Sequence, residues 1–192
     1  YAKRLDQNGL TKWTIAICKG AGDQSFPAVA ADGQGGAIVV WSDLRSGNTD
    51  IYAQRINSLG AVLWKPNGAE ICIDTSNQAE ASLISDGLGG TIIAWKDFRN
   101  GGNNADIFGQ RVSPGGVNQW TANGVTVCAA TGEQGQPQLT VDGFGGAIVV
   151  WQDGRVGVNS DVYAQHLQNS GSVSWTVNGV AISAAAGRQR NP

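Results

Sequence analysis

The sequence predicts an all-β protein that forms part of a β-propeller. The strongest evidence is a repeated motif, DGxGG followed by an apolar run that ends in Trp. The motif begins at Asp32, Asp86 and Asp142. A period of about 55 residues is typical of propellers or solenoids and not of a single globular core. The composition agrees, because 28 Gly, 7 Trp and no Met in 192 residues suit short strands and tight turns better than helices.

Each repeat divides into four predicted strands. In the first repeat, residues 27–33 alternate between apolar and small or polar side chains, as in a half-exposed strand. Residues 36–41 are continuously apolar, which is typical of a strand covered on both faces. Residues 50–56 alternate again, and a fourth strand is expected to begin at 61–64 and to continue past the turn KPNG into AEIC. Four-stranded antiparallel units repeated around an axis are propeller blades. The alternative, a β-solenoid, usually has shorter coils and fewer hairpin turns.

The glycine clusters are predicted to be hairpin turns. Asp-Gly between two apolar runs is a strong hairpin signal, because Gly adopts positive φ without strain. No predicted helix follows these clusters, and an anion-binding loop would need the N-terminus of one. Asp32, Gly33, Gly35 and Gly36 are therefore interpreted as turn residues.

The register of the repeat predicts about three and a half blades. Residues 1–4 align with 52–55, so the chain opens at a third strand, and Pro192 aligns with Pro27 and Pro137 where a first strand begins. The predicted units are a half blade at 1–26, blades at 27–80 and 81–136, and a blade with the lead-in to another at 137–192. A partial ring leaves sheet edges exposed. We expect a slice of a longer protein, or else a ring completed by another chain.

The repeat resembles those of large secreted and surface proteins of Bacteroidetes-type bacteria that carry a type IX secretion sorting domain. The resemblance lies in DGxGGAIVVWxDxRxGxxDIYAQR, followed by GxxxWxxNGVxI, and covers nearly the whole chain. It implies a propeller distantly similar to the sialidase superfamily and an extracellular or cell-surface location. The sialidase Asp-box, SxDxGxTW, is absent from the sequence, so the resemblance implies no particular enzyme activity.

Charge and hydropathy exclude several classes of partner. The formal net charge is −2 and the 13 basic residues are scattered singly, which argues against nucleic acid or an anionic membrane surface as the main partner. No stretch of the sequence is long and apolar enough to span a bilayer, so membrane insertion is not expected.

A ligand is expected on the face that carries the long loops after the second strand of each blade. A repeated Asp-Arg-Asp trio and a repeated Gln fall on this face. The Arg residues could bind carboxylate or sulfate groups of a glycan, or each could be held between two Asp of its own or the next blade. The second interpretation is favoured, because a trio present in every repeat does not provide the different roles that catalysis needs. The residues concerned are Asp43, Arg45, Asp50, Asp97, Arg99, Asp106, Asp153, Arg155, Asp161, Gln24, Gln78 and Gln134.

No cofactor is expected. Calcium is a weak possibility at Asp43, Asn48 and Asp50, because this loop lacks the dense acids and terminal Glu of an EF-hand. The cysteines occupy one equivalent slot in successive repeats, which should place them beyond the roughly 7 Å that a disulfide tolerates. We interpret Cys18, Cys72 and Cys128 as free, buried residues.

Other catalytic signals are sparse. The one histidine, His166, occupies the slot of Arg55 and Arg111, which indicates a variant of the repeat and not a general base. No Ser-His-Asp set is recognisable. Glu70, Glu80 and Glu133 each occur outside the consensus, and a pair of glycosidase carboxylates would have to come from such residues. Nothing in the sequence brings two of them together.

These observations favour a non-catalytic, extracellular binding or display module that is not an enzyme. Its expected partners are a glycan or a surface protein, together with further blades of the same protein or another copy of the chain. Two alternatives are a structural module of a surface layer or filament, and a fragment of a sialidase-like, glycan-active enzyme. The enzyme alternative requires acids from outside the repeat to converge in a pocket.

Overall fold

The described residues of the protein form three four-stranded antiparallel sheets and one two-stranded sheet. The computed structural model describes residues 1–192 except 102–103, 158, 185–186, 188 and 190–192, so the expected start of a further strand at Pro192 lies outside the described residues. The two-stranded sheet pairs β1 (Ala2–Leu5) with β2 (Thr11–Ile15). The other sheets contain β3 (Gln24–Ala31), β4 (Ala37–Asp43), β5 (Asp50–Ile56) and β6 (Ala69–Cys72); β7 (Gln78–Ser85), β8 (Thr91–Asp97), β9 (Asp106–Val112) and β10 (Val125–Cys128); and β11 (Gln134–Val141), β12 (Ala147–Asp153), β13 (Asp161–Leu167) and β14 (Val180–Ser183).

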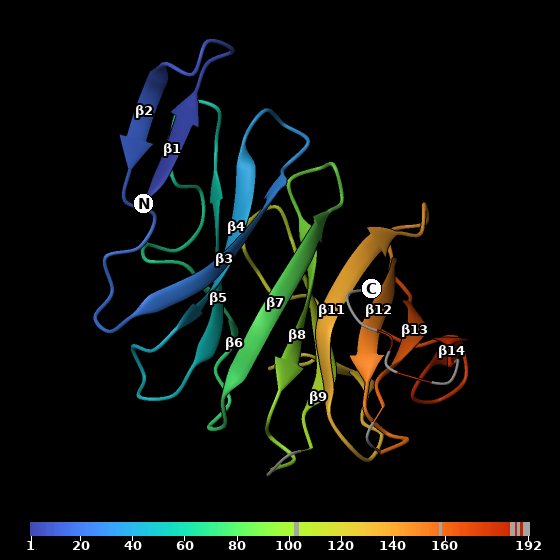
Figure 1. Ribbon diagram of the computed structural model, residues 1–192. Coiled ribbons are helices and arrows are strands. Elements are labelled where there is room, and N and C mark those ends of the chain that lie inside the picture. The colour runs from blue at the N-terminus through green and yellow to red at the C-terminus, as the bar shows by residue number, and fades with distance from the viewer. Residues whose placement is uncertain (102–103, 158, 185–186, 188, 190–192) are drawn as a thin grey trace.

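The sheets are arranged as blades around one axis, which confirms the partial propeller. Within each sheet the strands follow chain order, and the first strands β3, β7 and β11 lie next to one another at the centre (Figure 1). The long loops after β4, β8 and β12 all lie at the lower end in this view. We call these three sheets blades one to three, and the β1–β2 sheet the half blade.

Each first strand begins earlier than expected and contains a bulge. In blade one the strand starts at Gln24 and not at residue 27, and its pairing with β4 shifts register between Ser25 and Ala28. The residue inside each bulge has positive φ although it is not glycine: Phe26, Glu80 and Gln136 at 50°, 52° and 53°. A bulge re-aims side chains, and here it recurs at one level of the central strands.

The fourth strand differs from the expectation. Residue Val62 makes only an isolated bridge to Ile56, and the strand proper is β6. The amide of Trp64 donates to the side-chain oxygen of Gln54, at 2.9 Å, and not to a neighbouring strand. The following turn has positive φ at Asn67 and Gly68. The side chain of Gln54 therefore replaces part of the ladder that the sequence pattern predicted.

The core lies between the blades. Trp95 packs with Ile38 and Val40 of blade one, and Trp151 packs with Ile92 of blade two. The hairpin turns are as expected: Asp32 Oδ1 accepts hydrogen bonds from two backbone amides of its own turn, and its Oδ2 is 2.8 Å from Arg55 Nε. Apolar burial between successive blades is thus what holds the partial ring together.

Two of the cysteines are expected to be unreactive in the folded protein. All three are free as predicted, and Cys72 and Cys128 are buried, but Cys18 is only partly buried, contrary to the expectation. Burial raises the pKa of both thiols to about 12, so the reactive thiolate is scarce at mildly alkaline pH. Titration with a thiol reagent should leave both residues unmodified until guanidinium chloride unfolds the protein. A Cys18→Ser variant isolates their signal, and rapid modification of the native variant would contradict the prediction.

Candidate functional site

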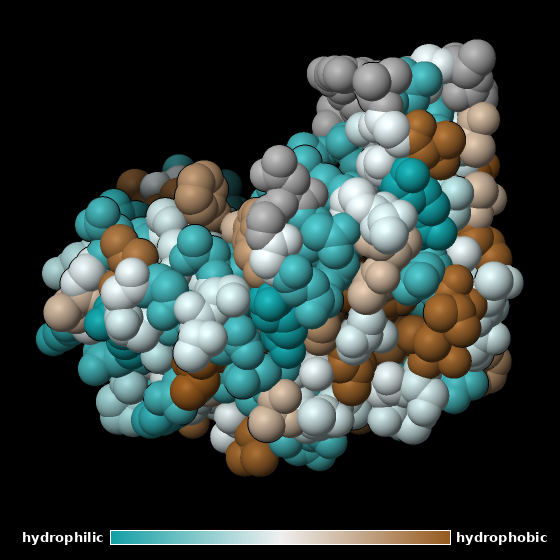
Figure 2. Space-filling model, turned by 90° about the horizontal axis from the view of Figure 1, so that it is seen from below, coloured by the Kyte–Doolittle hydropathy of each residue, from teal (hydrophilic) through white to brown (hydrophobic). Residues whose placement is uncertain are grey.

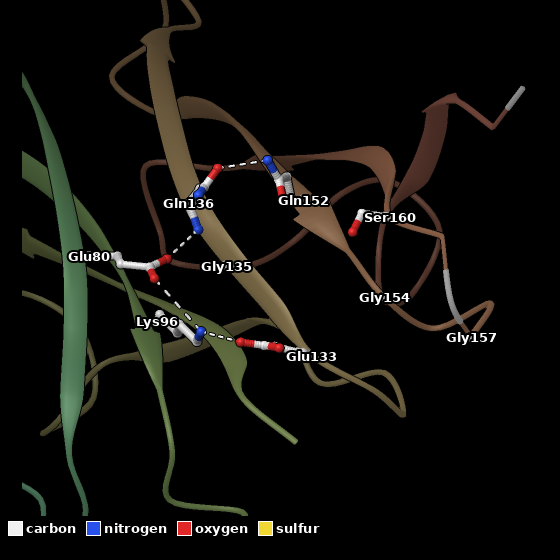
Figure 3. A pocket seen from close by; sticks show the side chains of 9 residues that line it. All are labelled: Glu80, Lys96, Glu133, Gly135, Gln136, Gln152, Gly154, Gly157 and Ser160. Carbon is white, nitrogen blue, oxygen red and sulfur yellow. Dashed lines mark hydrogen bonds and ion pairs between the residues drawn. The ribbon is translucent and has the colours of Figure 1, made fainter. Parts of the chain in front are cut away.

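A polar pocket lies at the long-loop end of the propeller, between blades two and three. Its volume is about 410 Å³, and Figure 2 looks onto this face from below, where hydrophilic side chains gather across the middle. Figure 3 shows the residues that line it: Glu80, Lys96, Glu133, Gly135, Gln136, Gln152, Gly154, Gly157 and Ser160.

Lys96 brings two glutamates together in this pocket. Its Nζ lies 3.7 Å from Glu80 Oε1 and forms a shorter ion pair with Glu133 Oε1 (Figure 3). The Lys96 side chain is 11% exposed, whereas those of Glu80 and Glu133 are 40% and 61% exposed. A largely covered ammonium thus holds two carboxylates that solvent, and a ligand, can reach.

A backbone hydrogen bond holds one carboxylate oxygen of Glu80 in place. Glu80 sits in the bulge of β7, and its Oε2 accepts a hydrogen bond of 2.6 Å from the backbone amide of Gln136, the equivalent bulge residue of β11. The side chain of Gln136 in turn accepts a hydrogen bond from Gln152 Nε2 at 2.7 Å. The bulges of neighbouring blades therefore build one wall of the pocket.

The pocket gathers positions at which the repeat changes its residue type. The equivalents of Glu80 are Phe26 and Gln136, those of Lys96 are Ser42 and Gln152, and those of Glu133 are Asp23 and Asn77. Different side chains at equivalent positions can take the different roles that catalysis requires. These changes of residue type are visible in the sequence. Glu133 directly precedes the repeated Gln, Glu80 follows it by two residues, and Lys96 lies between Trp and Asp of the WxD motif. Reasoning from the sequence noted two of the acids but missed Lys96 and the convergence.

The repeated Asp-Arg pairs lie elsewhere and form clasps inside each blade. Asp43, Asp97 and Asp153 are 0% exposed. In blade two, Asp97 accepts hydrogen bonds from Arg99 Nε at 2.8 Å, from Arg99 Nη2 at 2.7 Å and from Trp95 Nε1 at 2.8 Å. Blades one and three repeat this arrangement with Arg45 and Arg155.

Each of these Arg residues also contacts an aromatic ring of the third strand, a carbonyl of the turn before the fourth strand and the cysteine of the preceding blade. Arg99 lies over the ring of Phe108, 3.8 Å from its centroid, and its Nη2 donates to the carbonyl of Asn123 and to Cys72 Sγ of the preceding blade. Burial alone would raise the pKa of Asp43, but hydrogen bonds from Arg45 and Trp41 outweigh it and hold that pKa below its ordinary value. The Nε and Nη2 groups of each Arg are therefore engaged within the fold.

The second Asp of each trio does not hold the Arg, contrary to the expectation that two Asp would. Asp50 accepts hydrogen bonds from Ser46 Oγ and Asn48 Nδ2, and burial raises its pKa. Asp106 accepts one from Asn100, and burial raises its pKa too. Asp161 is 6% exposed at the start of β13. Asp50 and Asp106 therefore order the long loops of blades one and two from within.

The repeated Gln residues also serve the local backbone. Gln78 and Gln134 are 0% exposed and donate to the carbonyls of Ser76 and Gly132, while the exposed Gln24 donates to those of Ala21 and Gly22. None of the three lines the pocket between blades two and three. They lie beside the pocket residues in sequence and hold the start of each first strand.

At the position considered for calcium, the side-chain amide of Asn48 donates hydrogen bonds to the oxygens around it. Asn48 Nδ2 donates to Asp50 Oδ1, to the carbonyl of Asp74 and to that of Ser76, at 2.8–3.0 Å. Asp43 faces Arg45 and Trp41. Among the described residues no group of three or more His, Cys, Asp or Glu side chains is arranged to hold a metal ion.

A Ser-His-Asp contact exists that the sequence did not reveal. His166 Nε2 lies 2.8 Å from Asp142 Oδ2, and Ser174 Oγ lies 2.7 Å from His166 Nδ1. His166 here takes the place of Arg55, which binds Asp32 in the same way. The contact therefore repeats the turn clasp of the other blades, with Ser174 added at its outer end.

Solved structures show which known fold this chain shares. An endo-1,4-beta-xylanase from Bacteroides thetaiotaomicron matches at a TM-score of 0.54 and 12% identity, over 88% of this chain and 64% of that one. An endo-arabinase from the same bacterium matches at 0.53 and 15%, over 91% and 65%. An alpha-L-arabinanase from Penicillium chrysogenum matches at 0.53 and 14%, over 85% and 51%. No protein-family model and no curated protein matches by sequence.

These comparisons confirm the propeller and correct the functional expectation. At this level of identity the likeness shows the fold, and the chain spans about half to two thirds of the length of those proteins. The expectation of a non-catalytic module that is not an enzyme is wrong, because the similar structures are xylanase and arabinanase enzymes. None of the described residues forms a helix long and apolar enough to cross a membrane.

Proposed function

We propose that this chain is part of a glycan-active enzyme and that the pocket between blades two and three is its reaction site. The observation that carries the proposal is the convergence of Glu80 and Glu133 on Lys96. These acids lie outside the repeat consensus, as a catalytic pair in a repeat protein must. The enzyme names of the similar structures support the same conclusion.

The arrangement suits acid-base chemistry on a glycosidic bond. Most glycoside hydrolases use two carboxyl groups that flank the bond, one as general acid and the other as base or nucleophile. Glu80 and Glu133 take these roles in the proposal. Lys96 acts as a positioning residue, because its ammonium contacts both carboxylates. Gln136, Gln152 and Ser160 line the rest of the pocket and offer donors and acceptors for sugar hydroxyls.

The proposed substrate is a xylan- or arabinan-type polysaccharide, and the proposed location is outside the cell. The substrate class follows the names of the similar enzymes. Two of them come from a Bacteroides species, which supports the resemblance of the repeat to secreted proteins of that bacterial group. Xylan and arabinan are polysaccharides, and an enzyme that acts on such polymers is expected to encounter them outside the cell.

Glu80→Gln and Glu133→Gln should each abolish most of the activity while leaving the protein folded. Each change removes an acid or base but keeps the size of the side chain, so we expect a fall in kcat/KM of about a hundredfold or more. The measurement is the release of reducing sugar from arabinan and from xylan. Retention of the same polysaccharides in affinity electrophoresis separates binding from turnover.

Glu70→Gln is the matched control. Glu70 is also outside the repeat consensus, but it lies in β6 and pairs with Lys65 on the outside of blade one. The control should behave as the unsubstituted protein does in both assays. If the Glu80 and Glu133 variants bind and cleave as well as the control, the pocket is not the reaction site.

A further inference from the structure

The half blade leaves one sheet edge without a neighbour. Strand β1 pairs with β2 alone, and among the described residues no strand pairs with its other edge. In the three complete blades the equivalent third strand, such as β5, pairs on both sides. Unpaired backbone groups of this kind accept an added strand.

An apolar cavity of about 330 Å³ lies beside this edge. It is lined by residues of the half blade, including Ala2 and Ile17, and by Val29, Val39 and Trp41 of blade one. Val29 is 67% exposed, whereas its equivalents Leu83 and Leu139 pack against the cores between blades. The cavity therefore occupies the place where a second strand lies in the complete blades.

Arg4, on this edge, contacts no carboxylate among the described residues. Its Nη1 donates to the carbonyls of Gly35 and Ser58, at 2.9 and 3.0 Å. Its equivalent Arg55 binds Asp32, the aspartate in the hairpin turn between the first two strands of its own blade. Blades two and three make the same link with Arg111 to Asp86 and with His166 to Asp142.

Tyr1 also lacks the partner that its equivalents have. Its exposed fraction is 90%, whereas that of Tyr52 is 5%. Arg45, which follows the second strand of blade one, lies 3.9 Å from the ring centroid of Tyr52 and covers it. Tyr163 is covered by Arg155 in the same way.

We propose that the free edge of β1 and the adjoining cavity form a binding site for a β-hairpin. This hairpin has the sequence pattern of the first two strands of a repeat, including the DGxGG turn between them. The DGxGG turn of the hairpin provides the aspartate for Arg4, and its apolar second strand pairs with β1 and fills the cavity. The Arg that follows the second strand covers Tyr1.

The interfaces between the complete blades identify this occupant. Ile38 and Val40, from the second strand of blade one, pack in one cluster with Trp95 of blade two. Ile92 and Ala94 of blade two pack in the same way with Trp151. Trp41 is the equivalent residue of blade one; the half blade packs against it and leaves it 3% exposed, and its remaining face lines the cavity. A second strand of the repeat would contact that face as Ile38 and Val40 contact Trp95.

The test is the binding of a synthetic peptide with the sequence of residues 27–45 to the whole chain. We expect saturable binding at one peptide per chain by fluorescence anisotropy, with slower amide exchange of Ala2–Leu5. Arg4→Ala in the chain, or Asp32→Ala in the peptide, should each weaken binding about tenfold, since each removes one charge-assisted contact. The two changes together should weaken it little further, because they remove the same contact.

Lys12→Ala is the matched control, because it removes a cation from β2, away from the free edge, and should leave binding unchanged. Circular dichroism verifies that each variant is folded. The proposal is overturned if the peptide does not bind, or if Arg4→Ala and Lys12→Ala have equal effects. It is also overturned if light scattering shows multimers of the chain that Arg4→Ala converts to monomers, since a second copy would then occupy the site.

Discussion

Asp97→Ala is expected to lower the free energy of unfolding by about 3–5 kcal/mol, the usual cost of removing one partner of a buried ion pair. Asp97 is 0% exposed and accepts hydrogen bonds from Arg99 and Trp95. Without it, a guanidinium that is 20% exposed and a buried indole N–H lose their acceptor. Denaturation in guanidinium chloride, followed by tryptophan fluorescence, measures the loss.

A double-mutant cycle distinguishes the clasp from nonspecific damage. If Asp97 and Arg99 stabilise the protein through each other, Asp97→Ala with Arg99→Ala should cost clearly less than the two single changes added together. Lys65→Ala provides a surface comparison, since Lys65 and Glu70 form an exposed pair of little expected effect. A loss below about 1 kcal/mol for Asp97→Ala would contradict the clasp.

Trp95→Ala should also cost about 3–5 kcal/mol, the range observed for large-to-small changes in a core. Trp95 is 0% exposed and lies in the cluster that joins blades one and two. The change leaves a cavity there and removes the hydrogen bond from its indole to Asp97. The measurement is again the free energy of unfolding, followed by circular dichroism because the substitution removes a fluorophore.

Trp175→Ala is the natural comparison, because Trp175 belongs to the other series of repeated Trp and is 39% exposed. It should cost less than about 1 kcal/mol. Equal losses for the two variants would mean that the clusters between blades do not dominate stability.

Much of the fold could be predicted from the sequence because the repeat displays the same local pattern several times. The DGxGG turns and the continuously apolar second strand are local features, and the structure has both. The third strand is present too, but β5 is buried at every residue except Arg55, so its alternating sequence does not produce the exposed face that was expected. The early start of β3 at Gln24 and the short β6 could not be predicted in this way. The first depends on a bulge with positive φ at Phe26, and the second on a side-chain contact from Gln54 to Trp64.

The candidate site was only partly predictable, for a related reason. The expected face of the propeller carries the pocket, and Glu80 and Glu133 are distinguishable as acids outside the repeat. Their meeting depends on Lys96, which reaches across from blade two to the start of blade three. The Arg and the first Asp of each repeated trio form an ion pair inside their own blade.

The sequence by itself determined the blade, because turn residues and apolar periodicity act between neighbours along the chain. It also determined which acids depart from the repeat. Only the tertiary structure decided which positions of different blades face one another, since that depends on how the sheets pack about the axis. Packing turned the repeated charges into internal clasps and brought Glu80, Lys96 and Glu133 into one pocket. Only the structure shows that Tyr1 and Ala2 of the β1 edge line an apolar cavity with residues of blade one.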